Sequence, residues 1–226
     1  MEYLLDTANL EAIKNYRDIF PITGITSNPS IVKKEGNVDF FKHMKQIREL
    51  IGMDKTFHIQ VTSMDVAGML KDAAAILKHV DDKIYIKVPV TIEGMQVIRK
   101  LKREHINVTA TAIYSKTQGF LAMEAGADFI APYYNRMENS GIDPDDVITA
   151  FAEMIAENGY NTKILAASFK NAGQVDRAFL AGAQTATMDP SILVSALQQP
   201  SILKAVDDFS NDWKSIYGDL SIHQMK

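Results

Sequence analysis

Lys87 is the residue whose position most strongly suggests chemistry. It lies inside the apolar run 84–90, which is typical of a short buried strand ended by a proline. Burial disfavours the charged form of a lysine, and lowering its pKa from ~10.4 to about 7.5 would cost about 4 kcal/mol while raising the free-amine fraction several hundredfold. A free amine on a rigid strand can attack a carbonyl and form a Schiff base. The ordinary alternative is a strand-end lysine whose stem lies on apolar surface while its head reaches water.

Polar side chains suited to carbonyl chemistry recur near the ends of most predicted strands. They are Asp6, Thr26, Ser27, Asn28, Gln60, Lys87, Thr111, Tyr133, Asn135, Arg136 and Ser168. In a closed barrel of parallel strands, catalytic groups lie at the carboxyl ends of the strands. Period-two alternation places Tyr85 and Lys87 on one face of their strand, and Thr109 and Thr111 on one face of the next. This recurrence around a ring indicates a shared pocket.

Each of these residues also has a purely structural explanation. Asp6 and Asn28 could cap the loops that follow them, since Asn28-Pro29 is a common turn start. Thr111 could be a half-buried strand threonine bonded to the backbone. Tyr133 could be a core aromatic residue whose hydroxyl has a partner. For single residues the structural explanation is the stronger one, but for the set as a whole we favour a catalytic pocket.

The charged residues argue against some classes of partner. The chain has 24 Lys and Arg against 28 Asp and Glu, and its formal net charge of -4 argues against nucleic acid as a main partner. The basic stretch 99–103 is expected to coat a solvated helix face. Arg136 could pair at the surface with Glu138 or Asp128, which is its structural alternative to a role in the pocket.

Metal catalysis is poorly supported by the sequence, and we expect neither a metal nor another cofactor. The chain has no cysteine, and its histidines form neither an H-x-H nor an H-E-x-x-H motif. No G-x-S-x-G elbow and no Walker-type loop occurs. An imine-forming lysine is therefore the best candidate source of chemistry.

Short apolar runs alternate with longer amphipathic ones along the whole chain. The strand candidates are residues 3–6, 22–27, 57–61, 84–88, 107–112, 129–132, 163–168 and 185–188. Eight strands, each followed by a helix, predict a single closed (β/α)8 barrel, a TIM barrel, over residues 1–226. An open doubly wound sheet is the competitor, but the first turn, Asp6-Thr7-Ala8-Asn9, lacks the glycine-rich phosphate loop of such sheets.

Local signals mark the helix starts and a final helix. Ser115-Lys116-Thr117-Gln118 has the form of a capping box, and Asp143 and Asp189 each precede a proline at a first helical position. The segment 201–217 is predicted to be a ninth helix beyond the barrel. Its apolar residues at helical spacing are Val206, Phe209, Trp213 and Tyr217. This stripe needs a surface to pack on, either its own barrel or a neighbouring subunit.

The composition is that of an ordinary globular protein, with 46% hydrophobic and 23% charged residues. A chain of 226 residues can bury a full core in one domain. Residues 1–6 show no charged leader followed by an apolar core, and no apolar stretch approaches membrane-spanning length. We therefore expect a cytoplasmic protein with no membrane partner.

Five short motifs run in order along the chain and are specific in combination. They are Leu5-Asp6-Thr7-Ala8, Gly24-Ile25-Thr26-Ser27-Asn28-Pro29-Ser30, Ile86-Lys87-Val88-Pro89-Val90-Thr91, Ala131-Pro132-Tyr133-Tyr134-Asn135-Arg136 and Ala166-Ala167-Ser168-Phe169. Together they make the sequence similar to the small transaldolase family, and the similarity extends to Asp212-Trp213 near the end of the chain. The resemblance implies an α/β barrel with a Schiff-base lysine on the fourth strand, which the match places at Lys87.

The resemblance also implies roles for other residues of the pocket. Asp6 would bind a substrate hydroxyl and handle protons during carbon–carbon bond cleavage. Thr26 and Asn28, with Ser27 between them in place of the common threonine, would hold the hydroxyls of a dihydroxyacetone unit. Thr111 would help to fix a catalytic water.

A sugar phosphate is the substrate that the resemblance implies, and its phosphate would be bound by Arg136 and Ser168. The family further implies a homo-oligomer, since its members are commonly ring-shaped pentamers, often stacked as decamers. In these the terminal helix reaches a neighbour. For segment 201–217, the resemblance thus favours packing on a neighbouring subunit.

Two positions separate the aldolase and transaldolase members of that family. Transaldolases usually carry a glutamate on the third strand and a phenylalanine after the sixth, whereas this chain has Gln60 and Tyr133. An amide cannot exchange protons near neutral pH, which leaves Tyr133 as the acid/base and Gln60 to orient a water. The leading hypothesis is a class I aldolase that cleaves or forms fructose 6-phosphate from dihydroxyacetone and glyceraldehyde 3-phosphate. The alternatives are a transaldolase of the pentose phosphate pathway and a non-catalytic barrel that binds sugar phosphates.

Overall fold

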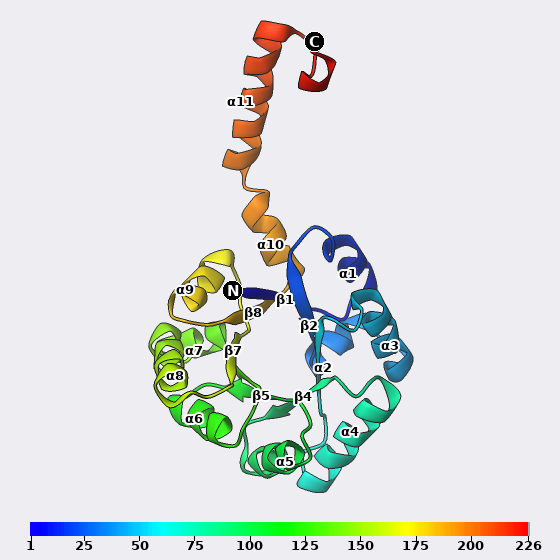
Figure 1. The fold of residues 1–226 in the computed structure, drawn as a ribbon, viewed down its shortest axis with the longest axis vertical. Coiled ribbons are helices and arrows are strands. Elements are labelled where there is room, and N and C mark those ends of the chain that lie inside the picture. The colour runs from blue at the N-terminus through cyan, green and yellow to red at the C-terminus, as the bar shows by residue number, and fades with distance from the viewer. Residues whose placement is uncertain (226) are drawn as a thin grey trace. The chain divides into compact units, whose positions relative to one another are not determined.

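Eight parallel strands close into a barrel in which each strand pairs with the next and β8 pairs with β1 (Figure 1). The computed structural model describes residues 1–225, which form two compact units, Met1–Pro190 and the chain from Ser191 onward. The strands of the first unit are β1 (Glu2–Asp6), β2 (Ile22–Thr26), β3 (Thr56–Gln60), β4 (Tyr85–Pro89), β5 (Val108–Ile113), β6 (Phe129–Pro132), β7 (Lys163–Ala166) and β8 (Thr185–Met188). The predicted closed (β/α)8 barrel is confirmed.

Helices surround the ring of strands in Figure 1. They are α1 (Leu10–Tyr16), α2 (Pro29–Val32), α3 (Phe40–Ile51), α4 (Val66–His79), α5 (Ile92–Arg103), α6 (Lys116–Glu124), α7 (Tyr134–Asn139), α8 (Pro144–Asn158) and α9 (Ala172–Leu180), with a 3-10 turn η1 (Lys33–Glu35). The sequence pattern did not predict α2 and α7, because helices of 4 and 6 residues are too short to show a helical period. Both begin directly after segments of the candidate pocket.

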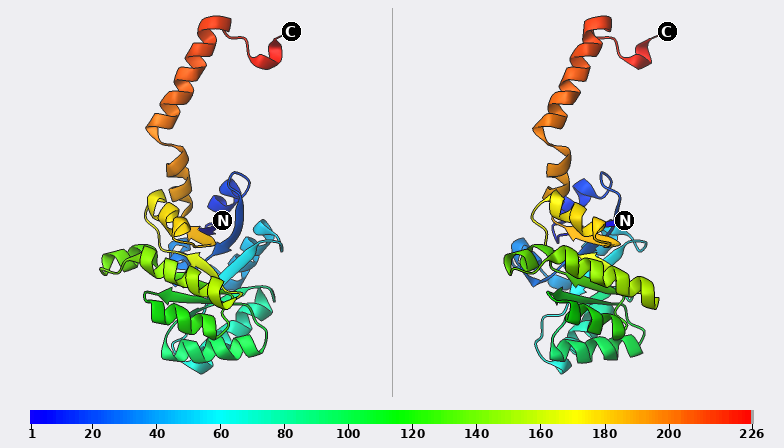
Figure 2. Two further views of the ribbon diagram at one scale, coloured as in Figure 1. Left: turned by 60° about the vertical axis from the view of Figure 1, so that its left-hand side comes forward. Right: turned by 90° about the vertical axis from the view of Figure 1, so that its left-hand side faces the viewer.

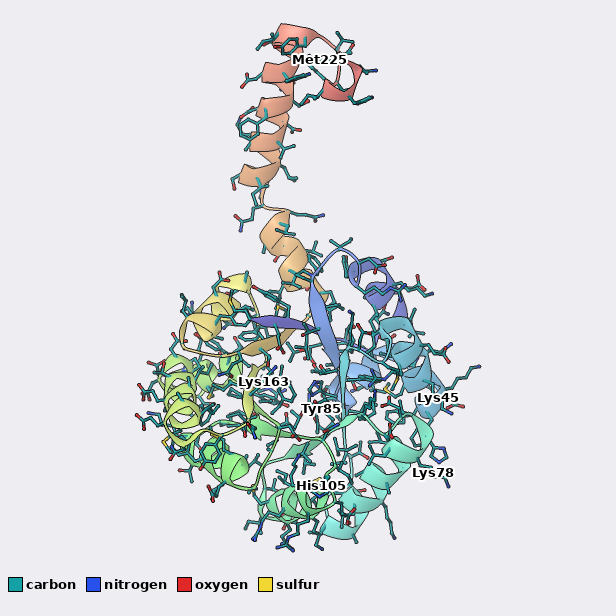
Figure 3. All side chains as sticks on the ribbon, viewed as in Figure 1. Lys45, Lys78, Tyr85, His105, Lys163 and Met225 are labelled. Atoms are coloured by element: carbon teal, nitrogen blue, oxygen red, sulfur yellow. The ribbon has the colours of Figure 1, made fainter. Side chains whose placement is uncertain are left out.

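The interior of the barrel contains an apolar layer. Its buried cluster comprises Leu4, Phe129 and Leu165, with Tyr85 packed against it. Figure 3 shows Tyr85 within the ring of strands, whereas Lys45 and Lys78 lie on the outside. Contacts inside the ring between residues of non-neighbouring strands, such as the edge-to-face pair of Tyr85 and Phe129, confirm that these faces point inward.

A polar layer follows the apolar one toward the carboxyl ends of the strands. Leu4 is followed two residues later by Asp6 on β1, and Tyr85 is followed two residues later by Lys87 on β4. Residues two apart on a strand share a face, so Asp6 and Lys87 also point into the barrel. Strand direction therefore carries these groups to the end of the barrel at which active sites are built.

Predicted and observed strand ends agree within about two residues, and the backbone explains two of the differences. β7 stops at Ala166, after which Ala167 forms only an isolated bridge with Tyr133 and Ser168 turns out of the extended conformation with a φ of 65°. β5 runs on to Ile113 through Ala112, whose φ is 59°, with a register shift between Ala110 and Ile113. Such a bulge bends the strand and redirects the side chains around it.

The predicted capping box at the start of α6 is present in an altered form. The Ser115 hydroxyl accepts a hydrogen bond from the Gln118 backbone N–H at 3.3 Å, as expected. The Gln118 side chain, however, accepts from the N–H of Tyr114 at 2.9 Å, one residue before the cap. The two proline-led starts are confirmed, because α8 begins at Pro144 with Asp143 as its cap and α10 begins at Pro190.

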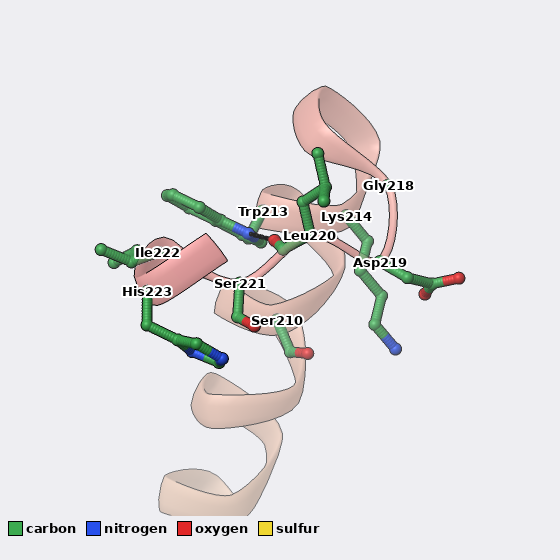
Figure 4. A pocket seen from close by; sticks show the side chains of 9 residues that line it. All are labelled: Ser210, Trp213, Lys214, Gly218, Asp219, Leu220, Ser221, Ile222 and His223. Carbon is green, nitrogen blue, oxygen red and sulfur yellow. Dashed lines mark hydrogen bonds between the residues drawn. The ribbon is translucent and has the colours of Figure 1, made fainter. Parts of the chain in front are cut away.

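The chain from Pro190 onward forms α10 (Pro190–Leu197), α11 (Pro200–Tyr217) and the 3-10 turn η2 (Ile222–Gln224). Figure 2 shows α11 as one continuous helix, which confirms the predicted final helix with a start one residue earlier. The indole Nε1 of Trp213 donates to the carbonyl of Leu220 at 2.7 Å and folds the chain back beside α11 (Figure 4). Within residues 1–225, no helix is both long and apolar enough to cross a membrane.

Candidate active site

Lys87 is buried in the wall of the barrel, with an exposed fraction of 2%. On β4 it lies opposite Gln60 of β3 on one side and Thr109 of β5 on the other. Its positive charge lowers the pKa of Asp6, so the two groups interact across the interior. The alternative of a lysine whose head reaches bulk water does not fit this burial.

Asp6 ends β1 and is held by a short chain of hydroxyl groups. Its pKa is raised above the ordinary value because burial disfavours the carboxylate, although Lys87 and a hydrogen bond from Thr26 offset part of this effect. Thr26 Oγ1 donates to Asp6 Oδ1 at 2.5 Å and lies 2.7 Å from Thr187 Oγ1. The Thr26 hydroxyl is thus engaged in orienting Asp6. Asp6 does not cap the following helix, since Asn9 caps α1.

We expect Asp6→Asn to raise the melting temperature at pH 7. A carboxyl whose pKa is raised by folding opposes folding once it is ionised, and an amide keeps the acceptor oxygen for Thr26 without the charge. Below the ordinary pKa of 3.8 the carboxyl is protonated in both states and the penalty vanishes. The penalty grows as the pH rises from there to the folded-state pKa and stays constant above it. Thermal unfolding of both proteins from about pH 3 to about pH 8 tests this. A variant that is less stable than the wild type at pH 7 contradicts it.

A cavity of about 290 Å³ lies where β2 and β3 end, and its polar lining includes Ser27, Asn28 and Gln60. Ser27 Oγ and Gln60 Oε1 are buried and have no hydrogen-bond partner among the described residues. Unpaired buried polar atoms beside a cavity are positions at which a ligand or a water binds. Asn28 also caps α2, because its Oδ1 accepts from the Ile31 N–H at 3.1 Å, so the capping alternative is confirmed for this residue.

Thr111 and Tyr133 form a hydroxyl pair at the ends of β5 and β6. Thr111 Oγ1 lies 3.0 Å from Tyr133 Oη, and Thr111 is fully buried. The Thr111 hydroxyl therefore bonds to a side chain, whereas the structural alternative was a bond to the backbone. In the sheet, Thr111 lies opposite Pro89 of β4. The Tyr133 hydroxyl has a partner, as the structural alternative required, but that partner is another group of the candidate pocket.

Arg136 of α7 lies beside Tyr133 and Tyr114. Its guanidinium carbon is 4.8 Å from the centroid of the Tyr133 ring, and its Nη1 donates to Tyr114 Oη at 3.1 Å. The hydrogen bond with Tyr114 raises the pKa of Arg136 further, so this side chain is always charged. The loop with Ser168 is joined to the same helix, since the Asn135 N–H donates to the Ser168 carbonyl at 3.0 Å. Tyr114 was not singled out from the sequence.

The surface pairing considered for Arg136 is not formed. Glu138 pairs with Arg177 at 2.8 Å, and Asp128 pairs with Lys102 at 2.7 Å. In the part of the chain that the structure describes, no carboxylate forms an ion pair with Arg136. An exposed guanidinium without a carboxylate partner suits a phosphate, which it can bind through two parallel hydrogen bonds.

His58 of β3 is a further inward-facing residue that the sequence analysis did not select. It is fully buried, its Nδ1 lies 2.8 Å from Thr109 Oγ1, and its ring stacks on Tyr85 at 4.8 Å. Burial lowers the pKa of His58 well below its ordinary value, and the charge of Lys87 adds to this effect, so the ring is neutral. The signal that could have found it is alternation, because His58 and Gln60 share one face of β3.

The arrangement brings a buried amine, a carboxyl group with a raised pKa and a paired tyrosine hydroxyl to one end of the barrel. Such a set can form an imine and move the protons that imine chemistry needs. Among residues 1–225, no group of three or more His, Asp or Glu side chains is placed to hold a metal ion.

Comparison with known proteins identifies the family. Residues 3–220 match the family described as Transaldolase/Fructose-6-phosphate aldolase. The chain belongs to this family. A protein of Streptococcus pneumoniae (strain ATCC 700669 / Spain 23F-1), named probable fructose-6-phosphate aldolase, is 52% identical over 222 residues, which is 98% of this chain and 100% of the relative. The resemblance to the transaldolase family is therefore confirmed, and with it an enzyme of the aldolase or transaldolase type.

Proposed function

We propose that this protein is a class I aldolase that cleaves and forms fructose 6-phosphate through an imine on Lys87, in the cytoplasm and without a cofactor. The observation that carries the proposal is the burial of Lys87 at the end of the barrel, facing the Asp6 carboxyl. Its amine is a nucleophile on a rigid strand, in a chain that matches an aldolase family over nearly its whole length.

In the proposed reaction, the Lys87 amine attacks the C2 carbonyl of the sugar and water is lost to give an imine. Asp6, oriented by Thr26, takes the proton of the C4 hydroxyl as the C3–C4 bond breaks, and glyceraldehyde 3-phosphate leaves. The electron pair of the broken bond stays with C3 and becomes the C2=C3 bond of an enamine, so the dihydroxyacetone fragment remains attached to the Lys87 nitrogen. Tyr133 protonates C3 of this enamine, and the proton held by Asp6 is passed back to Tyr133 through water. Hydrolysis of the imine by a water then releases dihydroxyacetone and the free amine.

The remaining pocket residues bind and orient in this proposal. Thr111 and Gln60 hold the water, which is supported by the contact of Thr111 with Tyr133 and by the unpaired oxygen of Gln60. Ser27 and Asn28 bind the hydroxyls of the three-carbon unit. Arg136 binds the phosphate together with Ser168 of the adjoining loop.

The experiment that tests the function measures consumption of fructose 6-phosphate alone and then with erythrose 4-phosphate added. We expect cleavage to dihydroxyacetone and glyceraldehyde 3-phosphate without an acceptor, because Tyr133 can protonate the enamine directly. Consumption that requires erythrose 4-phosphate would instead identify a transaldolase. No consumption in either assay, with fructose 6-phosphate still bound, would identify a binding barrel.

We also propose that α11 packs on a neighbouring copy of the chain in a homo-oligomer, such as a pentamer or decamer. Val206, Phe209 and Ile216 on this helix have exposed fractions of 57%, 71% and 71%. An apolar stripe of this kind is typical of a helix that is covered in an assembly.

Phe209→Asp is therefore expected to lower the mass of the particle in light scattering to that of a monomer or a smaller assembly. A carboxylate in an apolar interface loses its hydration without gaining a partner. Asn211→Asp, which adds the same charge on the opposite face of α11, is the matched control and should leave the mass unchanged. An unchanged mass for Phe209→Asp would contradict the proposed interface.

A further inference from the structure

Gln174 lies in the first turn of α9, directly after the loop that carries Ser168. Asn171 caps this helix and accepts from the Gln174 backbone N–H at 3.0 Å. The Gln174 side chain reaches back, and its Oε1 accepts from the Lys170 N–H at 2.7 Å. With an exposed fraction of 4%, the amide is almost fully buried, so each of these bonds forms away from competing water.

The other end of the Gln174 amide reaches a different helix. Its Nε2 donates to Asn135 Oδ1 at 3.1 Å and to Glu138 Oε2 at 2.5 Å, and both acceptors belong to α7. Arg136 lies between them in the sequence and is carried by the same six-residue helix. A single side chain thus ties the start of α9 to the helix that bears the guanidinium.

These contacts close a ring of hydrogen bonds around Ser168. The Asn135 N–H donates to the Ser168 carbonyl, the Asn135 side chain accepts from Gln174, and Gln174 accepts from Lys170, two residues beyond Ser168. Ser168 has a φ of 65°, which a residue with a side chain adopts only where its surroundings enforce it. The hydrogen bonds at the Ser168 carbonyl and at the Lys170 N–H hold the backbone in this conformation.

The first turn of α6 has a glutamine at the same position as Gln174 in α9, and comparing the two shows which contacts occur only in α9. Gln118 occupies the equivalent position after its cap and accepts from the Tyr114 N–H in the same way. Its Nε2, however, donates to the backbone carbonyls of Val90 and Ala112 at 3.1 and 3.3 Å. Of the two glutamines, only Gln174 uses its side-chain amide to bind side chains of a neighbouring helix.

The other side-chain ties between α9 and α7 among the described residues come from Arg177, and they are more exposed to solvent. Arg177 of α9 donates to Glu138 Oε1 at 2.8 Å and to Tyr134 Oη at 2.9 Å, but its side chain has an exposed fraction of 47%. Ion pairs that are open to solvent contribute little to holding a geometry. The amide of Gln174 is therefore the most deeply buried of the side-chain links between α9 and α7.

We propose that Gln174 is a positioning residue for the phosphate end of the substrate. By joining α7 to the loop before α9, it fixes the separation of Arg136 from Ser168. The inference rests on the proposed function in one respect, the assignment of these two residues to the phosphate. Because a small displacement of a binding group lowers affinity strongly, the loss of the link should weaken phosphate recognition and leave the imine chemistry intact.

The test compares two aldehyde acceptors in the condensation with dihydroxyacetone, glyceraldehyde 3-phosphate and D-glyceraldehyde. In Gln174→Met, which keeps the side-chain length without hydrogen bonds, we expect KM for glyceraldehyde 3-phosphate to rise about tenfold with kcat within about twofold. The kcat/KM for D-glyceraldehyde, which has no phosphate, should stay within about twofold of the wild type.

Two further variants separate positioning from general stability. Gln174→Glu keeps the acceptor for Lys170 but places a carboxylate against Glu138, so KM for the phosphorylated acceptor should rise at least as much as in Gln174→Met. Asn171→Ala removes the cap of α9 and leaves the link, so it should lower the melting temperature without raising that KM.

Calorimetric titration with inorganic phosphate gives a readout that does not depend on turnover, and Gln174→Met should bind phosphate about tenfold more weakly than the wild type. A folded Gln174→Met or Gln174→Glu with wild-type KM and phosphate affinity would overturn the inference, as would equal losses for both acceptors. A wild type that binds phosphate in a Gln174-dependent way but condenses neither acceptor would overturn the proposed function and support the positioning role.

Discussion

Lys87→Met is expected to reduce turnover of fructose 6-phosphate by about 10⁴-fold or more, because the proposed mechanism forms the imine on this amine. Methionine matches the length of the lysine stem and carries no charge, so it can fill the same buried space on β4. The fold should therefore survive the change. Initial rates of cleavage, with melting temperatures measured in parallel, test the expectation.

Lys170→Met is the matched control for this substitution. Lys170 is exposed, lies two residues beyond Ser168, and contributes only its backbone N–H to the contacts described above. Its replacement should leave the rate of cleavage within about twofold of the wild type. A Lys87→Met protein that retains a tenth or more of the wild-type rate would show that the nucleophile is elsewhere.

Tyr133→Phe is expected to lower kcat for fructose 6-phosphate cleavage about 10²- to 10⁴-fold, the usual contribution of a positioned acid/base group. The variant loses the hydroxyl that lies 3.0 Å from Thr111 Oγ1 but keeps the ring beside Arg136. Binding of the phosphate should thus be preserved, and KM should change by no more than about twofold. Steady-state kinetics separate the two effects.

Tyr114→Phe provides the comparison, since it removes a neighbouring tyrosine hydroxyl that contacts Arg136 instead of Thr111. It should change KM modestly and leave kcat close to that of the wild type. If Tyr133→Phe retained most of its kcat, or if both variants lost kcat equally, Tyr133 could not be the acid/base of the proposed mechanism.

The barrel was predictable because its determinants are local. Eight apolar runs of strand length alternate with amphipathic segments, and each signal lies within a short window of sequence. Lys87 could be selected for the same reason, because a single charged residue inside an apolar run is recognised from the local sequence alone. A pocket shared with Asp6 followed as an expectation once alternation and strand direction were combined.

The contacts that organise the pocket could not be predicted, because they join positions far apart in the chain. His58 meets Thr109 across 51 residues, and Gln174 meets Asn135 across 39. The sequence analysis assigned Thr26 to a substrate hydroxyl through the family resemblance, yet its own hydroxyl lies between Asp6 and a residue 161 positions later. Only the closure of the barrel brings such partners together.

Gln174 illustrates a signal that was present in the sequence but not decisive. Asn171 followed three residues later by Gln174 has the same spacing as Ser115 and Gln118, which the sequence analysis did recognise. The pattern marks a helix start in both cases. It does not reveal that the Gln174 amide continues to a second helix, since that depends on the position of α7, a helix too short to be predicted.

Trapping of the imine tests the central claim most directly. The protein is incubated with dihydroxyacetone, reduced with borohydride, digested and analysed by mass spectrometry. We expect the mass of the reduced three-carbon donor on the peptide that contains Lys87, and none in a control without dihydroxyacetone. Labelling of a different lysine, or no labelling of a protein that cleaves fructose 6-phosphate, would contradict the assignment of Lys87 as the nucleophile.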